Sequence, residues 1–234
     1  MRTDLTDITI VLDRSGSMDA VKDDTIGGFN SFLADQKAVP GDATLSLVQF
    51  DTAYEPLYTG RPIQEAPPLT PETFKPRGGT ALLDAIGRTI NATGARLSAI
   101  PEADRPGRVI FVIVTDGQEN SSTEFIAHIN PVQPASERPK LTDVVFGMIK
   151  HQTEAYRWEF VFLGANQDAI TVAQALSIPT SNALHYASNQ QGTPMAFAAA
   201  SAGVARNRTA PVGTSKSYFS EEERQAQVAA GATK

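Results

Sequence analysis

Five residues with oxygen-bearing side chains stand where the chain leaves an apolar stretch or enters a predicted helix. They are Asp13, Ser15, Ser17, Thr80 and Asp116. A hard divalent cation such as Mg²⁺ takes about six oxygen ligands at roughly 2.0–2.1 Å. Because this set offers carboxylates and hydroxyls and contains neither nitrogen nor sulfur, it favours Mg²⁺ or Mn²⁺ over zinc or copper.

Each of these residues also has an ordinary structural explanation. Serine, threonine and aspartate are preferred at helix N-termini, so Ser15, Ser17 and Thr80 could simply cap helices. Asp116 and Gly117 could form a common turn. The combination favours a metal site, since the five donors come from three separate stretches and each stretch lies at the boundary of a predicted element.

The elements that must position these residues alternate between strand and helix. Apolar runs predict strands over 5–12, 44–50, 108–115, 158–163 and 183–186, with 54–58 as an edge strand. Helical periodicity predicts helices from about 18 to 39, from 80 to 97, over 141–149, over 170–176 with Asp168 as its cap, and over 194–206.

This alternation predicts an α/β fold, with a doubly wound, mostly parallel central sheet and helices on both faces. Ligands of such sheets bind beyond the carboxyl ends of the strands, where the strand order reverses. If the strands 5–12 and 108–115 are neighbours at that point, Asp13 and Asp116 emerge side by side.

Other segments are predicted from composition. The proline-rich stretch 59–79 is expected to be a loop, and Gly27-Gly28 is expected to let its helix approach the sheet closely. Segment 118–140 is either a packed surface excursion or a specificity loop. We expect one domain over 1–208 and a C-terminal tail over 209–234, with a possible short helix that begins at Ser220.

Composition narrows the function classes. A net charge of −6, a pI near 5.1 and the lack of a basic run argue against nucleic acid or an anionic membrane as partner. The absence of cysteine removes disulfides and thiolate chemistry. The N-terminus lacks the apolar region of a secretory signal, so the expected location is the cytoplasm or a particle assembled there.

The sequence gives little support to catalysis. It contains no Gly-x-Ser-x-Gly elbow, phosphate-binding loop or Gly-x-Gly-x-x-Gly fingerprint. The histidines His128, His151 and His185 lie outside the proposed ligand turns. A non-enzymatic role is therefore expected, and a Mg²⁺-dependent hydrolase is the less favoured alternative.

The order of these motifs carries a resemblance. Asp-x-Ser-x-Ser at 13–17, Gly-Gly-Thr at 78–80 and Asp-Gly at 116–117 resemble the von Willebrand factor A (vWA) family, over roughly residues 5 to 190. In that family the matching residues form the metal-ion-dependent adhesion site. The resemblance implies that Ser15, Ser17 and Thr80 bind the ion directly and that the two aspartates act mainly through water.

The resemblance also implies how the site is used. An ion bound mainly by hydroxyls keeps much of its positive charge and accepts one more hard oxygen. The expected function is a protein-binding module whose partner supplies an Asp or Glu carboxylate, in a bacterial or phage-type intracellular protein. Candidate rim contacts are Arg77, Glu119, Asn120, Asn166 and Gln167. A structural subunit of a larger bacterial or phage assembly is the alternative, and the partner and the oligomeric state are left open.

Overall fold

Six strands form one mixed sheet in the computed structural model, which describes residues 1–128, 136, 138–166 and 168–232. The strand order is β3-β2-β1-β4-β5-β6, and the pairs are parallel except for β2 with β3. The strands are β1 (Arg2–Asp13), β2 (Asp42–Phe50), β3 (Tyr54–Pro62), β4 (Pro106–Thr115), β5 (Glu159–Gly164) and β6 (Ala183–His185).

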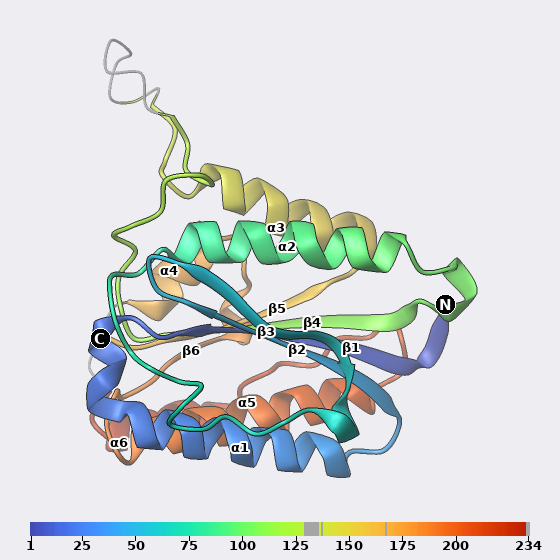
Figure 1. Ribbon diagram of the computed structural model, residues 1–234, viewed down its shortest axis with the longest axis horizontal. Coiled ribbons are helices and arrows are strands. Elements are labelled where there is room, and N and C mark those ends of the chain that lie inside the picture. Colours follow the sequence, from blue (N-terminus) through green and yellow to red (C-terminus); the bar gives the residue numbers. More distant parts are fainter. Residues whose placement is uncertain (129–135, 137, 167, 233–234) are drawn as a thin grey trace.

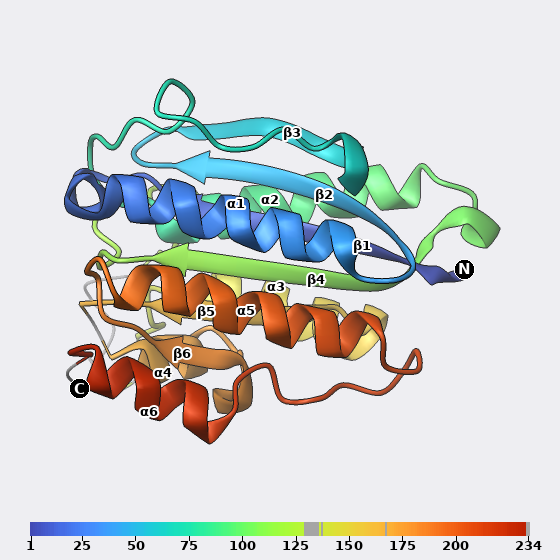
Figure 2. The same ribbon diagram turned by 90° about the horizontal axis from the view of Figure 1, so that it is seen from below.

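Helices cover both faces of this sheet. The α-helices are α1 (Lys22–Ala38), α2 (Leu82–Ser98), α3 (Asp143–Tyr156), α4 (Ala169–Ala175), α5 (Gly192–Arg208) and α6 (Glu221–Ala229). Short 3₁₀ turns are η1 (Gly16–Val21), η2 (Ile63–Glu65), η3 (Glu102–Asp104) and η5 (Thr180–Asn182). Figures 1 and 2 show α2, α3 and α4 on one face and α1, α5 and α6 on the other.

The central strands explain this layering. Every residue of β1 from Thr6 to Asp13 is buried, and β4 is almost wholly buried. Strands that are apolar on both sides need cover on both faces of the sheet. Side chains from β1, β4 and β5 accordingly divide between two hydrophobic clusters, one under α1 and α5 and the other under α2, α3 and α4. The predicted fold class and the predicted pairing of β1 with β4 are both confirmed.

The predicted loop over 59–79 is wrong at its beginning. Residues 59–62 continue β3, where Arg61 pairs with Leu45 and Pro62 with Thr44. The register shifts between these pairs and the earlier ones, and Gly60 adopts a positive φ of 57° there. An edge strand tolerates proline because one side of its backbone needs no partner. Local composition therefore pointed to a loop where pairing with β2 creates a strand.

Several predicted helix boundaries also move. The Asp-x-Ser-x-Ser turn leads into η1 before α1 begins at Lys22, and α2 begins at Leu82 rather than at Thr80. Helix α3 extends to Tyr156, and the next residue, Arg157, has a left-handed φ of 58°. The predicted cap of α4 is confirmed, since the Asp168 carboxylate accepts a hydrogen bond from the Thr171 N–H at 3.1 Å.

The C-terminal segment packs against the rest of the fold. Tyr218 is fully buried and donates a hydrogen bond from its hydroxyl to Glu159 Oε2 at 2.6 Å. Ser220 and Glu223 cap α6 reciprocally, in the arrangement called a capping box. The boundary between a domain at 1–208 and a tail at 209–234 stays a prediction. Within the described residues, no helix combines the length and apolar character needed to cross a membrane.

The two adjacent glycines of α1 have different environments. A Cβ on Gly28 would lie 2.5 Å from Phe197 Cδ2, whereas a Cβ on Gly27 would meet nothing within 4 Å. Gly28 therefore allows α1 to approach α5. The predicted close approach to the sheet was wrong, because the element that Gly28 contacts is α5.

We predict opposite effects of alanine at these two positions. Gly28→Ala forces the buried Phe197 ring to move and should lower the free energy of unfolding by about 1–3 kcal/mol. Gly27→Ala should raise it by up to about 1 kcal/mol, because alanine is the better helix former. Urea denaturation measures both values. Equal effects at the two positions, or no rescue of Gly28→Ala by Phe197→Leu, would contradict this packing.

Candidate metal centre

The two candidate aspartates lie at the carboxyl ends of neighbouring parallel strands. Asp13 is the last residue of β1, and Asp116 directly follows β4. In the register of these strands Leu12 pairs with Val114, so the two chains leave the sheet together. The strand order also reverses here, since β2 lies on one side of β1 and β4 on the other. The predicted juxtaposition follows directly from the topology.

The Asp13 carboxylate is held on both oxygens. Its Oδ1 accepts the Ser15 N–H at 2.7 Å, and its Oδ2 accepts the Thr115 hydroxyl at 2.6 Å. The residue is 0% exposed. The first bond folds the chain back after β1, so that Ser15 and Ser17 turn toward the end of β4.

The serines connect the first turn to Asp116. Ser15 Oγ lies 3.1 Å from Ser17 Oγ, and the Ser17 hydroxyl donates to Asp116 Oδ1 at 2.5 Å. The other oxygen of Asp116 accepts from the Ser188 hydroxyl at 3.3 Å. Ser188 lies just beyond β6 and was missed by the sequence reasoning. The signal that could have found it is its place after the predicted strand 183–186, at the same edge of the sheet.

The third hydroxyl comes from the turn before α2. Thr80 is 2% exposed; its backbone N–H donates to Asn120 Oδ1 at 2.9 Å, and its carbonyl accepts the Asn120 N–H at 3.0 Å. A Cβ built on Gly117 would lie 2.8 Å from Thr80 Oγ1 and 3.6 Å from the Oγ atoms of both Ser15 and Ser17. Three hydroxyls from two distant stretches therefore surround one point beside Gly117.

This space and its donors fit a hard cation. The space beside Gly117 is bordered by three hydroxyl oxygens. The Asp116 carboxylate accepts one of these hydroxyls, that of Ser17, and the Asp13 carboxylate accepts the backbone N–H of Ser15. Oxygen donors of this kind are the ligands that Mg²⁺ and Mn²⁺ prefer. Among the described residues, no group of three or more His, Cys, Asp and Glu side chains could hold a metal. A site at this place would therefore depend on its hydroxyls.

Burial makes both carboxylates costly to ionise. Desolvation raises the pKa of Asp13 from 3.8 to about 6, and the nearby charge of Asp116 adds to this rise, although hydrogen bonds from Thr115 and Ser15 oppose it. Desolvation also raises the pKa of Asp116, against the hydrogen bonds from Ser17 and Ser188. A cation at this place would offset two charges that the fold has removed from water.

An ion-pair cluster ties the two ligand turns together. Arg14 is buried, and its Nε donates to Asp51 Oδ2 at 2.9 Å, while Arg77 Nε donates to the same oxygen at 2.8 Å. The backbones also join, since Arg77 N–H donates to Arg14 O at 2.8 Å and Gly16 N–H donates to Gly78 O at 3.1 Å. Asp51 was missed, although it directly follows β2 at the same edge of the sheet.

Most of the predicted rim residues hold loops in place. Glu119 accepts the Leu83 N–H at 2.9 Å at the start of α2, Asn120 supports Thr80, and Asn166 Nδ2 donates to Asp116 O at 3.2 Å. Arg77 is 59% exposed. Gln167 lies outside the described residues. Glu119 and Asn120 thus have a structural role, and contact of any of these side chains with a partner stays a prediction.

The beginning of segment 118–140 packs on α2. The Asp84 carboxylate accepts backbone N–H groups of Thr123, Glu124 and Phe125 at 2.8–2.9 Å. Residues 118–128 thus form a packed excursion around the N-terminus of α2. Residues 129–135 and 137 lie outside the described part of the chain, so a specificity role there stays a prediction.

Comparison with known proteins identifies the fold. No protein-family model and no curated protein matches this chain. Among solved structures, the vWF domain of the type V pili tip protein Mfa5 from Porphyromonas gingivalis is 12% identical, with a TM-score of 0.56, over 92% of this chain and 99% of that one. The pilus adhesin SpaC from Lactobacillus rhamnosus GG is 15% identical, with a TM-score of 0.61, over 88% of this chain.

A third similar structure is described as containing a bound metal ion. It is proximal thread matrix protein 1 (PTMP1) from the mussel byssus with a zinc-occupied MIDAS motif, at 14% identity and a TM-score of 0.50, over 77% of this chain. This chain spans 31% of SpaC and 43% of that PTMP1 structure. The chain has the von Willebrand factor A fold.

The buried carboxylate predicts a pH-dependent cost in stability. The pKa of Asp13 is higher in the fold than its ordinary value of 3.8, so its contribution to stability is fully present below pH 3.8 and is lost as the pH rises through about 6. Asp13→Asn should therefore raise the free energy of unfolding in EDTA at pH 7.5 by up to about 3 kcal/mol, and much less near pH 4.

Asparagine fits this position because its Oδ1 still accepts the Ser15 N–H, while the Thr115 hydroxyl can donate to Gly117 O at 3.1 Å instead. Urea denaturation at the two pH values measures the effect. Asp19→Asn is the matched control, since Asp19 is exposed in η1. Stabilisation that is equal at both pH values would contradict a charge effect.

Proposed function

We propose that this protein is a metal-dependent protein-binding module. Ser15, Ser17 and Thr80 would bind Mg²⁺ directly, and Asp13 and Asp116 would act mainly through water. One position of the ion would be completed by an Asp or Glu carboxylate of a partner protein. The observation that carries this proposal is the convergence of the three hydroxyls around Gly117, beside two buried carboxylates.

The choice of Mg²⁺ or Mn²⁺ rests on donor chemistry. The five side chains offer oxygen alone, whereas zinc sites in proteins commonly use histidine or cysteine. The zinc in the similar PTMP1 structure belongs to that protein. For this chain, the similarity to that structure supports a divalent cation at the site. The titrations described below therefore compare Zn²⁺ with Mg²⁺.

The partner's carboxylate follows from the balance of charge. Hydroxyl ligands donate less charge than carboxylates, so a cation bound directly by three hydroxyls remains a strong electrophile. A carboxylate from another protein would form a charge-assisted contact that depends on the metal. Two of the similar structures are pilus proteins, SpaC and Mfa5, and this supports a role in protein contacts. Whether the contact is transient or belongs to a larger assembly, and in which compartment, stays a prediction.

The surroundings of the donors favour binding over catalysis. Metal-assisted hydrolysis needs a general base or nucleophile within hydrogen-bond reach of the reacting centre. The described side chains that hydrogen-bond to the two aspartates and to the Thr80 backbone include Thr115, Ser17, Ser188, Asn166 and Asn120. These are neutral groups that hold ligands in place, which suits a rigid binding site.

We predict that filling the space beside Gly117 removes metal binding and leaves the fold intact. Gly117→Ala places a methyl group 2.8 Å from Thr80 Oγ1, in the space that the ion would use. Calorimetric titration with Mg²⁺ should show a loss of affinity of at least about tenfold, which corresponds to about 1.4 kcal/mol. Gly16→Ala is the matched control, because its Cβ would meet only Gly78 O at an ordinary 3.4 Å.

A second pair of variants separates the hydroxyl from the shape of the side chain. Thr80→Ala should lose Mg²⁺ affinity, and Thr80→Ser should keep most of it because the hydroxyl remains. Titration with Zn²⁺ and Mn²⁺ gives the order of preference. Unchanged Mg²⁺ affinity in Gly117→Ala and Thr80→Ala would refute the site.

We further predict that the bound ion keeps an exchangeable water where the partner docks. Mn²⁺ can replace Mg²⁺ and reports such a water through enhanced relaxation of the solvent protons. A short peptide that contains glutamate should lower this enhancement, because its carboxylate displaces the water. The same peptide with glutamine in place of glutamate should have a much weaker effect. An ion without exchangeable water would exclude the docking mechanism, even if metal binding itself were observed.

A further inference from the structure

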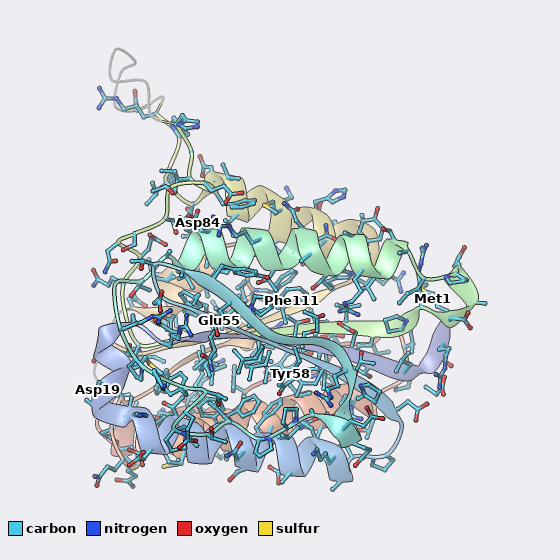
Figure 3. All side chains as sticks on the ribbon, viewed as in Figure 1. Met1, Asp19, Glu55, Tyr58, Asp84 and Phe111 are labelled. Carbon is cyan, nitrogen blue, oxygen red and sulfur yellow. The ribbon has the colours of Figure 1, made fainter. Side chains whose placement is uncertain are left out.

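A large hollow opens at the end of the sheet opposite the candidate metal centre. Its volume is about 840 Å³, and it lies between the ends of α2 and α3, the beginnings of β4 and β5, and residues 212–215. Met1 lines it, and Figure 3 places Met1 at the far end of the molecule from Asp19. Protein pockets of roughly 300–1,000 Å³ hold small organic ligands, so the hollow has the size of a small-molecule site.

The hollow reaches the hydrophobic core. Leu97, Val109 and Trp158 line it and are 7%, 6% and 6% exposed. Every other buried residue of their core cluster is exposed by 2% or less. The three members of this cluster with the highest exposure therefore all line the hollow. Trp158 also stacks on Phe111 with ring centroids 5.3 Å apart, which fixes the position of its indole.

The mouth of the hollow is apolar as well. Met1, Tyr156 and Val212 line it and are 68%, 63% and 45% exposed. These are three of the seven large hydrophobic side chains that are exposed in the described part of the chain. Exposed apolar side chains that gather around one opening mark a binding site more often than scattered ones do.

The charges at this opening are positive. The charged residues that line it are Arg105, Arg108, Arg157 and Glu159. Arg108 and Glu159 form an ion pair and cancel each other. Arg105 is anchored by two of its nitrogens, through bonds of 2.8 Å from Nε to Ile100 O and 3.0 Å from Nη2 to Ser98 O. Two positive charges therefore remain at this opening, in a protein with a net charge of −6.

Arg157 is the better placed of these two cations. It is exposed, it follows α3 with a left-handed backbone, and its Nη1 would lie 2.9 Å from a Cβ on Gly213. Its guanidinium therefore lies against residues 212–215 at the wall of the hollow. Guanidinium groups bind carboxylates through paired hydrogen bonds.

We propose that this hollow is a binding site for a small amphipathic carboxylate, with the apolar part of the ligand on Leu97, Val109 and Trp158 and its carboxylate at Arg157 and Arg105. This site is separate from the candidate metal centre and needs no metal ion. An experiment that rules out this site would therefore leave the proposed metal site unaffected, and the reverse also holds.

The tryptophan gives a direct reporter. Trp158 is the only tryptophan in the sequence. Titration with decanoate in EDTA should change its fluorescence saturably, and calorimetry should give the same affinity. Decanol and decylamine are the matched probes, because they share the alkyl chain and lack the negative charge. Decanoate should bind more tightly than either probe.

Two pairs of variants test the place and the charge. Gly94 lines the hollow, and a Cβ there would meet nothing within 4 Å, so Gly94→Leu should fill the space without unfolding α2. Gly147→Leu is its control, since Gly147 has equally open surroundings on α3 and does not line the hollow. Gly94→Leu should lower the affinity for decanoate at least about tenfold, which corresponds to about 1.4 kcal/mol. Gly147→Leu should leave it unchanged.

Arg157→Gln should weaken decanoate binding about two- to fivefold, as expected for an exposed ion pair, and should leave decanol binding unchanged. The proposal is overturned if no saturable signal is seen, or if Gly94→Leu binds decanoate as the unsubstituted protein does. It is also overturned if decanol or decylamine binds as tightly as decanoate. Sedimentation could instead show a dimer that does not bind decanoate. That result would also overturn the proposal, and it would assign the hollow to contact with a second copy of the chain.

Discussion

The site depends on two carboxylates that the sheet removes from water side by side. Asp13 ends β1 and Asp116 follows β4, and the parallel pairing of these strands fixes their proximity. Burial raises the pKa of both side chains, so the fold carries an electrostatic cost at neutral pH when no cation is present. Such a cost is typical of functional sites, where stability is given up for a prepared arrangement of charges.

The remaining parts of the site keep these carboxylates and their hydroxyl neighbours in fixed positions. Asp51 receives hydrogen bonds from Arg14 and Arg77 and so joins the turn after β1 to the turn before α2. Asn120 holds the backbone of Thr80 in place, because it accepts the Thr80 N–H and donates its own N–H to the Thr80 carbonyl. Because these supports are buried or bonded in pairs, the three hydroxyls are positioned before any ligand arrives. A preorganised site spends less of its binding energy on ordering side chains.

The sequence predicts the fold and the convergence of the five residues because both follow from local patterns. Long apolar runs indicate buried parallel strands, and the ends of such strands meet at one edge. Partners from distant segments are not visible in local patterns. Gly28 packs against Phe197 of α5 rather than against the sheet, Glu119 caps α2 from a later loop, and Ser188 reaches Asp116 from beyond β6. Whether a metal binds is also beyond the pattern, because caps and ligands use the same side chains.

The two ends of the sheet differ because parallel strands and their return helices place helix N-termini at one end and helix C-termini at the other. Helix N-termini gather near the carboxyl ends of the strands, where their partial positive charge favours carboxylates. Helix C-termini and their free carbonyls gather at the other end. Arginines donate hydrogen bonds to two of those carbonyls. Arg105 donates to Ser98 O, and Arg208 donates to Gln36 O at 2.7 Å.

Asp13 and Asp116 lie at the carboxyl ends of the strands, and Arg105 and Arg157 lie at the opposite end of the sheet. A cation site suits the first end. At the second end, the guanidinium groups that the carbonyls leave partly free can receive an anion. The two proposed ligands, which have opposite charges, therefore bind at opposite ends of one sheet. The topology produces this separation, because each of the helices α1 to α4 returns the chain to the start of a strand.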